Sequence, residues 1–222
     1  MKKIFLPLIV SCLFVIAAKA QLSNLDVAGG LKEALNKGVQ TSTQKLSAVN
    51  GFFANAAVKI LVPPEAQKME KTLRNMGFGD KVDQAILSMN RAAEDASKSA
   101  APIFLDAVKQ MTITDAIGIL KGGDSSATTY LRIKTSPALI AAFTPVIKAS
   151  LEKVDATKYW NTVVTTYDKV PFTKKINPDL TAYVTEKALS GLFYEIALEE
   201  ISIRKNPVER TSDILKKVFG SL

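Results

Sequence analysis

Hydrophobic residues recur every three or four positions along most of this chain, which is the spacing of one face of an α-helix. No stretch alternates hydrophobic and polar side chains in the way that a half-buried strand does. The longest helical pattern, Asp179–Arg204, contains no proline, with Asn177-Pro178 as a start and Asn206-Pro207 as a stop. Its hydrophobic residues occupy several faces, which is typical of a helix buried on most sides. The pattern predicts an all-α protein, a single multi-helix domain wrapped around a buried central helix near Asp179–Arg204.

Prolines and glycines divide the rest of the pattern into shorter helices. Pro63-Pro64 predicts the start of a helix that runs to Met76, and Ser136-Pro137 predicts the start of another. The alanine-rich stretch Ala92–Ala101 favours close approach of neighbouring helices. Three polar residues are candidate N-caps of later helices, because their side-chain oxygens can accept hydrogen bonds from a first turn: Asp80, Thr114 and Asp124.

The predicted central helix also carries charged residues that cannot be buried without partners. Glu195 and Glu199 share one face, and Glu200 reaches Arg204 one turn further on. Paired carboxylates can serve acid–base chemistry or bind a hard cation, whereas arginine partners would make them structural ion pairs. We expect at least one of these glutamates to be buried and paired with an arginine, the candidates being Arg91, Arg132 and Arg204.

A second polar group lies beside the alanine-rich stretch. Asn90 and Glu94 are four residues apart, as are Arg91 and Asp95, so each pair can meet on a helix surface. Such pairs are common and contribute little to stability when they are exposed. If neighbouring helices pack closely on the alanines, the same side chains instead form a partly desolvated network. The sequence leaves both readings open.

The stretch Lys121–Thr128 is rich in glycine and precedes a predicted helix, as phosphate-binding loops do. It lacks the spacing of a P-loop, however, and Asp124 would repel an anion. The end of one helix followed by the start of the next explains this stretch better.

The first residues have the anatomy of a secretory signal peptide. Lys2 and Lys3 precede a short hydrophobic run, and small residues precede the expected cleavage after Ala20. We therefore expect residues 1–20 to be a signal peptide and residues 21–222 to be a single domain that is exported to the periplasm. In the alternative, Cys12 belongs to a lipobox and is acylated. No later segment has the hydrophobic length of a membrane span.

Composition narrows the chemistry of the exported part. The chain has no histidine and a single cysteine, Cys12, which lies in the predicted signal peptide. Disulfides, thiol nucleophiles, thiolate zinc sites and histidine bases are thus excluded after cleavage, and we predict no metal site and no cofactor. The signal contains three lysines, so its removal lowers the net charge from +8 to +5. This charge is scattered without a basic, aromatic patch, which argues against nucleic acid as a partner.

Several short motifs in order along the chain resemble the bacterial domain-of-unknown-function family 4197. They span about Leu31 to Gly220 and comprise Met89–Glu94, Met111-Thr112, Asp115-Ala116, Ile119–Gly122, Ala127-Thr128, Tyr130, Tyr183–Thr185, Gly191–Phe193, Glu199-Glu200, Ile203-Arg204, Pro207, Arg210-Thr211 and Lys217–Gly220. The resemblance implies an exported helical domain and brings no activity with it. It gives weight to the polar residues at the family's motif positions, namely Asn90, Arg91, Glu94, Thr128, Tyr130, Arg132, Glu199, Glu200, Arg204 and Arg210.

Two functional hypotheses follow. The first is a non-enzymatic module of the cell envelope that binds a partner protein or an apolar ligand between its helices. The second is a carboxylate-dependent enzyme, assisted by a metal or not, that uses Glu94, Glu195, Glu199 or Glu200. Carboxylates that converge on a solvent-filled cleft would favour the enzyme, and a dry core with an arginine on each carboxylate would favour structural ion pairs.

Overall fold

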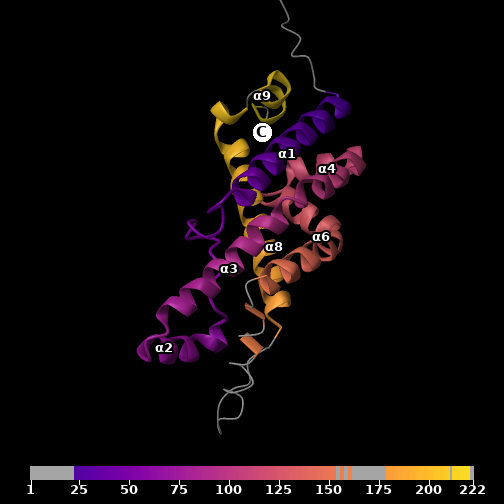
Figure 1. Cartoon of the computed structure of the whole chain (residues 1–222). Coiled ribbons are helices and arrows are strands. Elements are labelled where there is room, and N and C mark those ends of the chain that lie inside the picture. The colour runs from indigo at the N-terminus through magenta and orange to yellow at the C-terminus, as the bar shows by residue number, and fades with distance from the viewer. Residues whose placement is uncertain (1–22, 154–155, 158–159, 162–178, 211, 221–222) are drawn as a thin grey trace, which may run out of the picture.

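A long helix, α8 (Leu180–Lys205), runs through the middle of the computed structural model of this chain (Figure 1). The structure describes residues 23–153, 156–157, 160–161, 179–210 and 212–220. Asp179 is the N-cap of α8 and accepts a hydrogen bond from the Ala182 amide at 2.9 Å. The predicted start at Asn177-Pro178 lies outside the described residues.

Helix α8 is buried on most sides, as its hydrophobic pattern predicts. Val184, Ala188 and Leu192 have no exposed surface, and Phe193 and Ile196 have almost none. The helix packs against three others, which are α1 (Asn24–Ser47), α3 (Gly79–Ser97) and α6 (Ser126–Glu152). The described residues contain helices and no strand, so the all-α prediction and the central helix are both confirmed.

The remaining helices complete the two ends of the molecule. Figure 1 shows α4 and α9 beside α1 at one end, whereas α2 lies at the other end and is joined to the body by α3. The bounds of these elements are Pro64–Ala66 (η1), Gln67–Asn75 (α2), Ala100–Gln110 (α4), Ile113–Lys121 (α5), Pro207–Glu209 (η2) and Asp213–Gly220 (α9).

Small residues set the closest approaches between elements. Ala92, Ala93 and Ala96 are fully buried on α3, which packs extensively on α6, in agreement with the alanine-rich pattern. A Cβ atom added at Gly191 of α8 would lie 2.7 Å from a ring carbon of Phe52. Gly191 therefore lets the connection between α1 and η1 lie directly on the central helix.

The predicted N-caps are wrong in detail. The cap of α5 is Thr112 rather than Thr114, and it forms a capping box in which Thr112 and Asp115 each bond the other's backbone amide. Asp80 lies inside the first turn of α3, which begins after Phe78. A threonine or aspartate two residues inside a helix looks the same in sequence as a cap, because the hydrogen bond that distinguishes them depends on the backbone.

Helix α6 passes through two prolines without ending, so the predicted helix start at Ser136-Pro137 is also wrong. A proline inside a helix frees the carbonyl of the residue four positions earlier. For Pro137 and Pro145 these residues are Ile133 and Ala141, and both are exposed. The prolines lie on the solvent side of α6, where water can bond the freed carbonyls.

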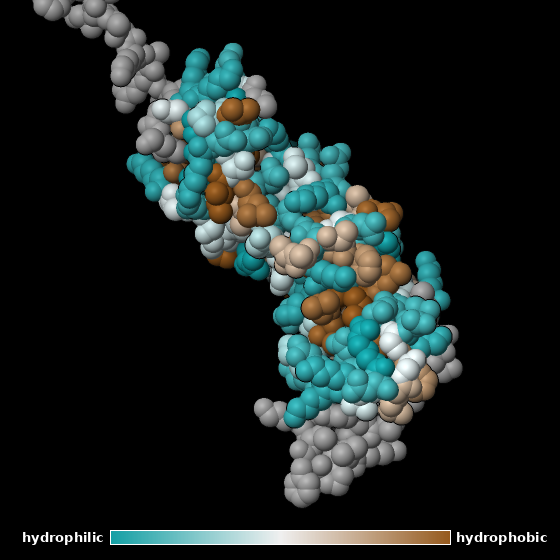
Figure 2. All heavy atoms as spheres, turned by 90° about the vertical axis from the view of Figure 1, so that its left-hand side faces the viewer, coloured by the Kyte–Doolittle hydropathy of each residue, from teal (hydrophilic) through white to brown (hydrophobic). Residues whose placement is uncertain are grey.

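The surface is mostly hydrophilic on the face that Figure 2 presents, with hydrophobic residues gathered in patches. The largest of these patches lies in the lower half of that view. Among the described residues, no helix has both the length and the hydrophobicity needed to cross a membrane.

Candidate functional site

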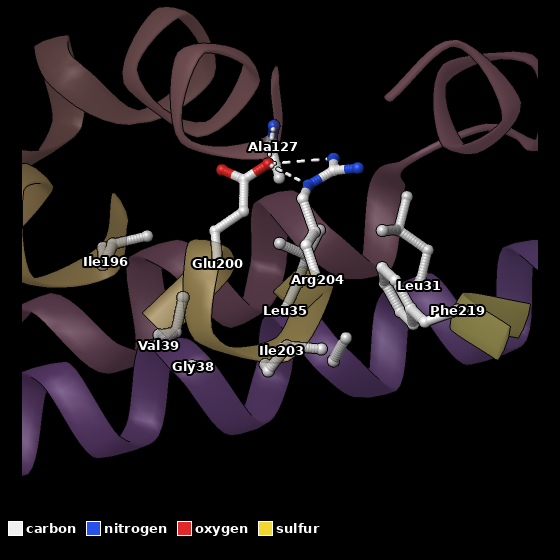
Figure 3. Close-up of a pocket in the computed structure, with 11 residues that line it drawn as sticks. Leu31, Leu35, Gly38, Val39, Ala127, Ile196, Glu200, Ile203, Arg204 and Phe219 are labelled. Carbon is white, nitrogen blue, oxygen red and sulfur yellow. Dashed lines mark hydrogen bonds and ion pairs between the residues drawn. The ribbon is translucent and has the colours of Figure 1, made fainter. Parts of the chain in front are cut away.

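Glu200 joins the start of α6 to the end of α5 through a buried ion pair (Figure 3). Its carboxylate accepts hydrogen bonds from the backbone amides of Ala127 at 3.0 Å and Thr128 at 2.8 Å, and from the Thr128 hydroxyl. The same carboxylate lies 2.9 Å from a guanidinium nitrogen of Arg204. Arg204 in turn donates to the Ile119 carbonyl in the last turn of α5. One ion pair thus caps two helix ends.

The capping by Glu200 replaces the local cap that the sequence suggests. Ser125, the N-cap of α6, forms no side-chain hydrogen bond with the first turn. Asp124, the predicted cap, instead pairs with Lys205. A carboxylate at a helix N-terminus satisfies free amides and interacts favourably with the helix dipole. Glu200, which lies on another helix, supplies both the acceptor for these amides and the negative charge at the start of α6.

Glu94 performs the same task for the connection between α1 and η1. One of its oxygens accepts hydrogen bonds from the amides of Phe52 and Phe53, both at 3.1 Å, and the other pairs with Arg91. Arg91 also donates to the side chain of Asn50 at 2.8 Å. Glu94 is buried, so these contacts form a partly desolvated network.

The pairs inside this network differ from the predicted ones. Arg91 pairs with Glu94, three residues away, and Asp95 pairs with Lys98. The side-chain amide of Asn90 bonds both the amide and the carbonyl of Ile60, each at 2.8 Å, rather than Glu94. Asn90 and Glu94 therefore hold the two ends of one connecting segment on α3.

Glu195 is the third buried carboxylate, and its partners are not arginines. Lys45 of α1 lies 2.6 Å from one of its oxygens, and the Asn55 side chain donates to the other at 2.7 Å. The Glu200–Arg204 pair meets the expectation of at least one buried glutamate with an arginine partner, whereas Glu195 has a lysine partner. Lysine suffices here because its own side chain stays half exposed while its ammonium group reaches the buried carboxylate.

The cavity at Glu200 is too small for a substrate, whereas Arg91 and Glu94 border an open pocket of ≈ 410 Å³. Glu200 and Arg204 border a cavity of only ≈ 20 Å³, lined mainly by hydrophobic side chains of α1 and α8 (Figure 3). Such a volume holds about one water molecule. Within the described parts of the chain, no three acidic side chains converge in a way that could hold a metal ion. The contacts of Glu94, Glu195 and Glu200 are those of structural groups.

Glu199 differs from its neighbours, because it forms no hydrogen bond or ion pair within the described residues and is only partly buried. Burial raises the pKa of its carboxyl above the usual range, and the nearby Glu209 carboxylate adds to this shift. Lys45 and Lys37 oppose it, but each is engaged with another glutamate, Lys45 with Glu195 and Lys37 with Glu209.

We expect Glu199→Gln to raise the free energy of unfolding at neutral pH. A carboxyl whose pKa is higher in the folded state ionises at a cost to the fold, and this cost grows as pH rises above the unfolded-state pKa. The gain should vanish below about pH 4, where the carboxyl is protonated in both states. Urea unfolding across this range measures it, with exposed Glu186→Gln as control. A gain independent of pH would contradict the electrostatic cause.

An open groove runs between α6 and α8. The two helices are antiparallel, because Glu200 near the end of α8 meets Ala127 at the start of α6. The groove has a volume of ≈ 580 Å³, and neither Glu200 nor Arg204 lines it. Its lining combines hydrophobic side chains with hydroxyls and charges, and consists of Arg132, Ser136, Ile140, Thr144, Lys148, Asp179, Thr181, Ala182, Thr185, Glu186, Leu189, Ser190 and Phe193.

Arg132 lies at one end of this groove. Its guanidinium carbon is 4.3 Å from the centre of the Phe193 ring, and Phe193 packs edge-to-face on Phe104 in the core. Arg132 is exposed, and no carboxylate pairs with it among the residues that the structure describes. The expectation that Arg132 neutralises a glutamate of the central helix is wrong.

Thr185 lies in the same groove with a buried hydroxyl that has no hydrogen-bond partner in the described structure. The residue is only 4 % exposed. Thr135 and Thr144 of α6, by contrast, each donate to the carbonyl four residues earlier. An unpaired buried hydroxyl costs about 1–3 kcal/mol. A polar atom of a bound ligand would remove this cost, so the α6–α8 groove is the candidate functional site.

The family resemblance is confirmed by a comparison with family models. The model described as "Protein of unknown function (DUF4197)" matches residues 21–220. The chain belongs to this family. No curated protein and no solved structure matches it.

The motif positions of the DUF4197 family lie in different parts of the structure. Most belong to the structural networks, and Arg210 joins them by donating to the carbonyls of Ile203 and Arg204 at the end of α8. Tyr130 is partly buried beside Lys134, and burial raises the pKa of its phenol. Of the predicted site residues, only Arg132 lines the groove.

Sequence reasoning missed most of the groove. Thr185, Leu189 and Phe193 recur at four-residue intervals, which is a signal for a shared helix face. That signal does not distinguish a face packed in the core from one that borders a groove.

Proposed function

We propose that this DUF4197 protein is a non-enzymatic module of the cell envelope that binds an apolar small molecule in the α6–α8 groove. The observation that carries the proposal is the contrast between its polar groups. The buried carboxylates are engaged by backbone amides and cations. Among the described residues, by contrast, no carboxylate pairs with Arg132 of the groove, and the buried Thr185 hydroxyl has no partner.

The contacts of the glutamates favour binding over catalysis. A general acid or base must reach a substrate proton within hydrogen-bond distance. Glu94 and Glu200 each accept at least three hydrogen bonds from protein groups, which leaves little capacity for a substrate. The carboxylate-dependent enzyme therefore has less support than the binding module.

The size of the groove also suits a small molecule. Ligand sites in proteins commonly measure about 300–1,000 Å³ and combine hydrophobic walls with a few polar groups. The groove, at ≈ 580 Å³, lies inside this range, with Ile140, Leu189 and Phe193 as its large hydrophobic side chains.

The cellular location in this proposal rests on the sequence of the first residues, which lie outside the described part of the chain. A basic start, a short hydrophobic run and the small residues before Gln21 support export to the periplasm.

Native mass spectrometry of the protein purified from its own host tests the proposal. We expect the mass of a chain that begins at Gln21, together with a non-covalently bound small molecule. Ala182→Trp places a large side chain on the groove and should remove the bound mass. The control is Ala138→Trp, an equally exposed alanine of α6 that does not line the groove.

Two results would contradict the proposal in different ways. A bare chain, or bound mass retained by Ala182→Trp, would remove the groove as the binding site. An acylated chain that begins at Cys12 would contradict cleavage after Ala20 and favour the lipoprotein alternative.

A further inference from the structure

The two ends of the α6–α8 groove differ in their charge. Lys148 and Asp179 line one end, and Lys148 lies 4.0 Å from Glu152. Arg132 lies at the other end, with no carboxylate paired to it among the described residues. Negative charge on a ligand is therefore attracted to the Arg132 end.

The position of Arg132 suits the recognition of a carboxylate. The guanidinium lies over the Phe193 ring, and its N–H groups can donate hydrogen bonds to a ligand in the groove. Phe193 is itself held by Phe104, so the platform is rigid. Arginine binds a carboxylate through two parallel hydrogen bonds, which are stronger than neutral ones.

The middle of the groove is suited to a hydrocarbon chain. Ile140 is 48 % exposed although it is a large hydrophobic residue, and Leu189 borders the groove from the facing helix. Ile140 lies eight residues from Arg132 on α6, which corresponds to about 12 Å along a helix. A chain that leaves Arg132 along the groove would cover both side chains.

Thr185 is a second polar group, at a similar distance from Arg132 along the groove. It lies eight residues from Phe193 on α8, again about 12 Å from the Arg132 end. Its buried hydroxyl has no protein partner in the described structure. A pure hydrocarbon would leave it unpaired, whereas a hydroxyl or ester oxygen part-way along the chain would bond to it.

The groove favours such an amphiphile over a peptide. Its walls are helices, so an extended peptide finds no strand edge to pair with. A stable protein interface covers about 800 Å² on each partner. A groove of ≈ 580 Å³ offers a small molecule better enclosure than it offers a folded partner.

We infer that the ligand of the α6–α8 groove is a long-chain carboxylic acid with a second polar oxygen part-way along its chain. Its carboxylate binds Arg132, its chain lies on Ile140 and Leu189, and its second oxygen bonds to Thr185. This inference rests on the proposed function and specifies the class of ligand.

Three probes of similar size separate the two polar contacts. Ricinoleate has a carboxylate and a mid-chain hydroxyl, oleate has the carboxylate alone, and oleyl alcohol has neither. Calorimetric titration of the full exported chain, below the micelle concentration of each probe, should rank their affinities in that order. We expect a difference of about tenfold at each step.

Variants assign each difference in affinity between two probes to one side chain. Arg132→Gln should remove the preference for oleate over oleyl alcohol, whereas Lys134→Gln, which removes the same charge two residues away and outside the groove, should keep it. Arg132→Lys should restore only part of the preference, because lysine lacks the planar fork. Thr185→Val should remove the preference for ricinoleate over oleate and leave oleate binding unchanged.

The outcomes distinguish the inference from the proposed function. Equal binding of oleate and oleyl alcohol, abolished by Ala182→Trp, would overturn carboxylate recognition and leave the groove as a ligand site. Equal binding of ricinoleate and oleate would overturn the role of Thr185. Binding of none of the probes, with a bare chain in native mass spectrometry, would overturn both.

Discussion

Glu200→Gln will lower the free energy of unfolding by about 3–5 kcal/mol, the cost of breaking a buried ion pair by removing one partner. The side chains of Glu200 and Arg204 are only 5 % and 8 % exposed. Glutamine keeps the shape of the side chain but leaves the Arg204 charge uncompensated, and its NH2 group replaces an oxygen that accepts from the Ala127 or the Thr128 amide. Urea unfolding followed by circular dichroism measures the loss.

A double mutant separates the ion pair from the general effect of substitution. Glu200→Gln combined with Arg204→Met should be less destabilised than the sum of the two single variants, because the pair is lost only once. Some loss remains, since Arg204 also donates to the Ile119 carbonyl. Exposed Glu186→Gln is the control and should stay within about 0.5 kcal/mol of the wild type. A Glu200→Gln loss of similar size to this control would show that the pair is solvated.

Glu94→Ala will release the connection between α1 and η1 and cost about 3 kcal/mol, because two backbone donors and one arginine lose their acceptor. The loss of protection from hydrogen exchange should be confined to this connection. Hydrogen exchange should show the amides of Phe52 and Phe53 losing protection, while the buried amides of α8 keep theirs.

The neighbouring aspartate provides the control for this second experiment. Asp95 lies on the same helix, but its side chain is 45 % exposed and pairs with exposed Lys98, so Asp95→Ala should change stability by at most about 1 kcal/mol. Uniform loss of protection in Glu94→Ala, extending to α8 as strongly as to Phe52 and Phe53, would contradict a role confined to this connection.

The burial of charges could be predicted without the structure, because it follows from the pattern of one helix. Leu192, Phe193 and Ile196 surround Glu195 in sequence, so a helix buried on those sides takes Glu195 with it. The structure confirms this for Glu195 and Glu200, at 2 % and 7 % exposure. Glu200–Arg204 was also predictable, since both residues lie one turn apart on the same helix.

The other partners could not be predicted from local pattern. Lys45 is 150 positions from Glu195, and the Ile60 backbone is 30 positions from Asn90. Nothing in the spacing of such residues brings them together. Their contacts depend on how α1 and its following segment pack on α3 and α8, and on small residues such as Gly191 that permit the approach.

The sequence by itself determined the helical class, the central helix and the need to neutralise its glutamates, because hydrophobic periodicity reports the directions of side chains along a single helix. The tertiary structure alone decided which residues neutralise them, which side chain caps α6, and where Arg132 and Thr185 lie. A carboxylate from another helix can replace a local cap, as Glu200 does for α6. The α6–α8 groove arises in the same way, since a groove is a property of two packed helices and of neither sequence segment alone.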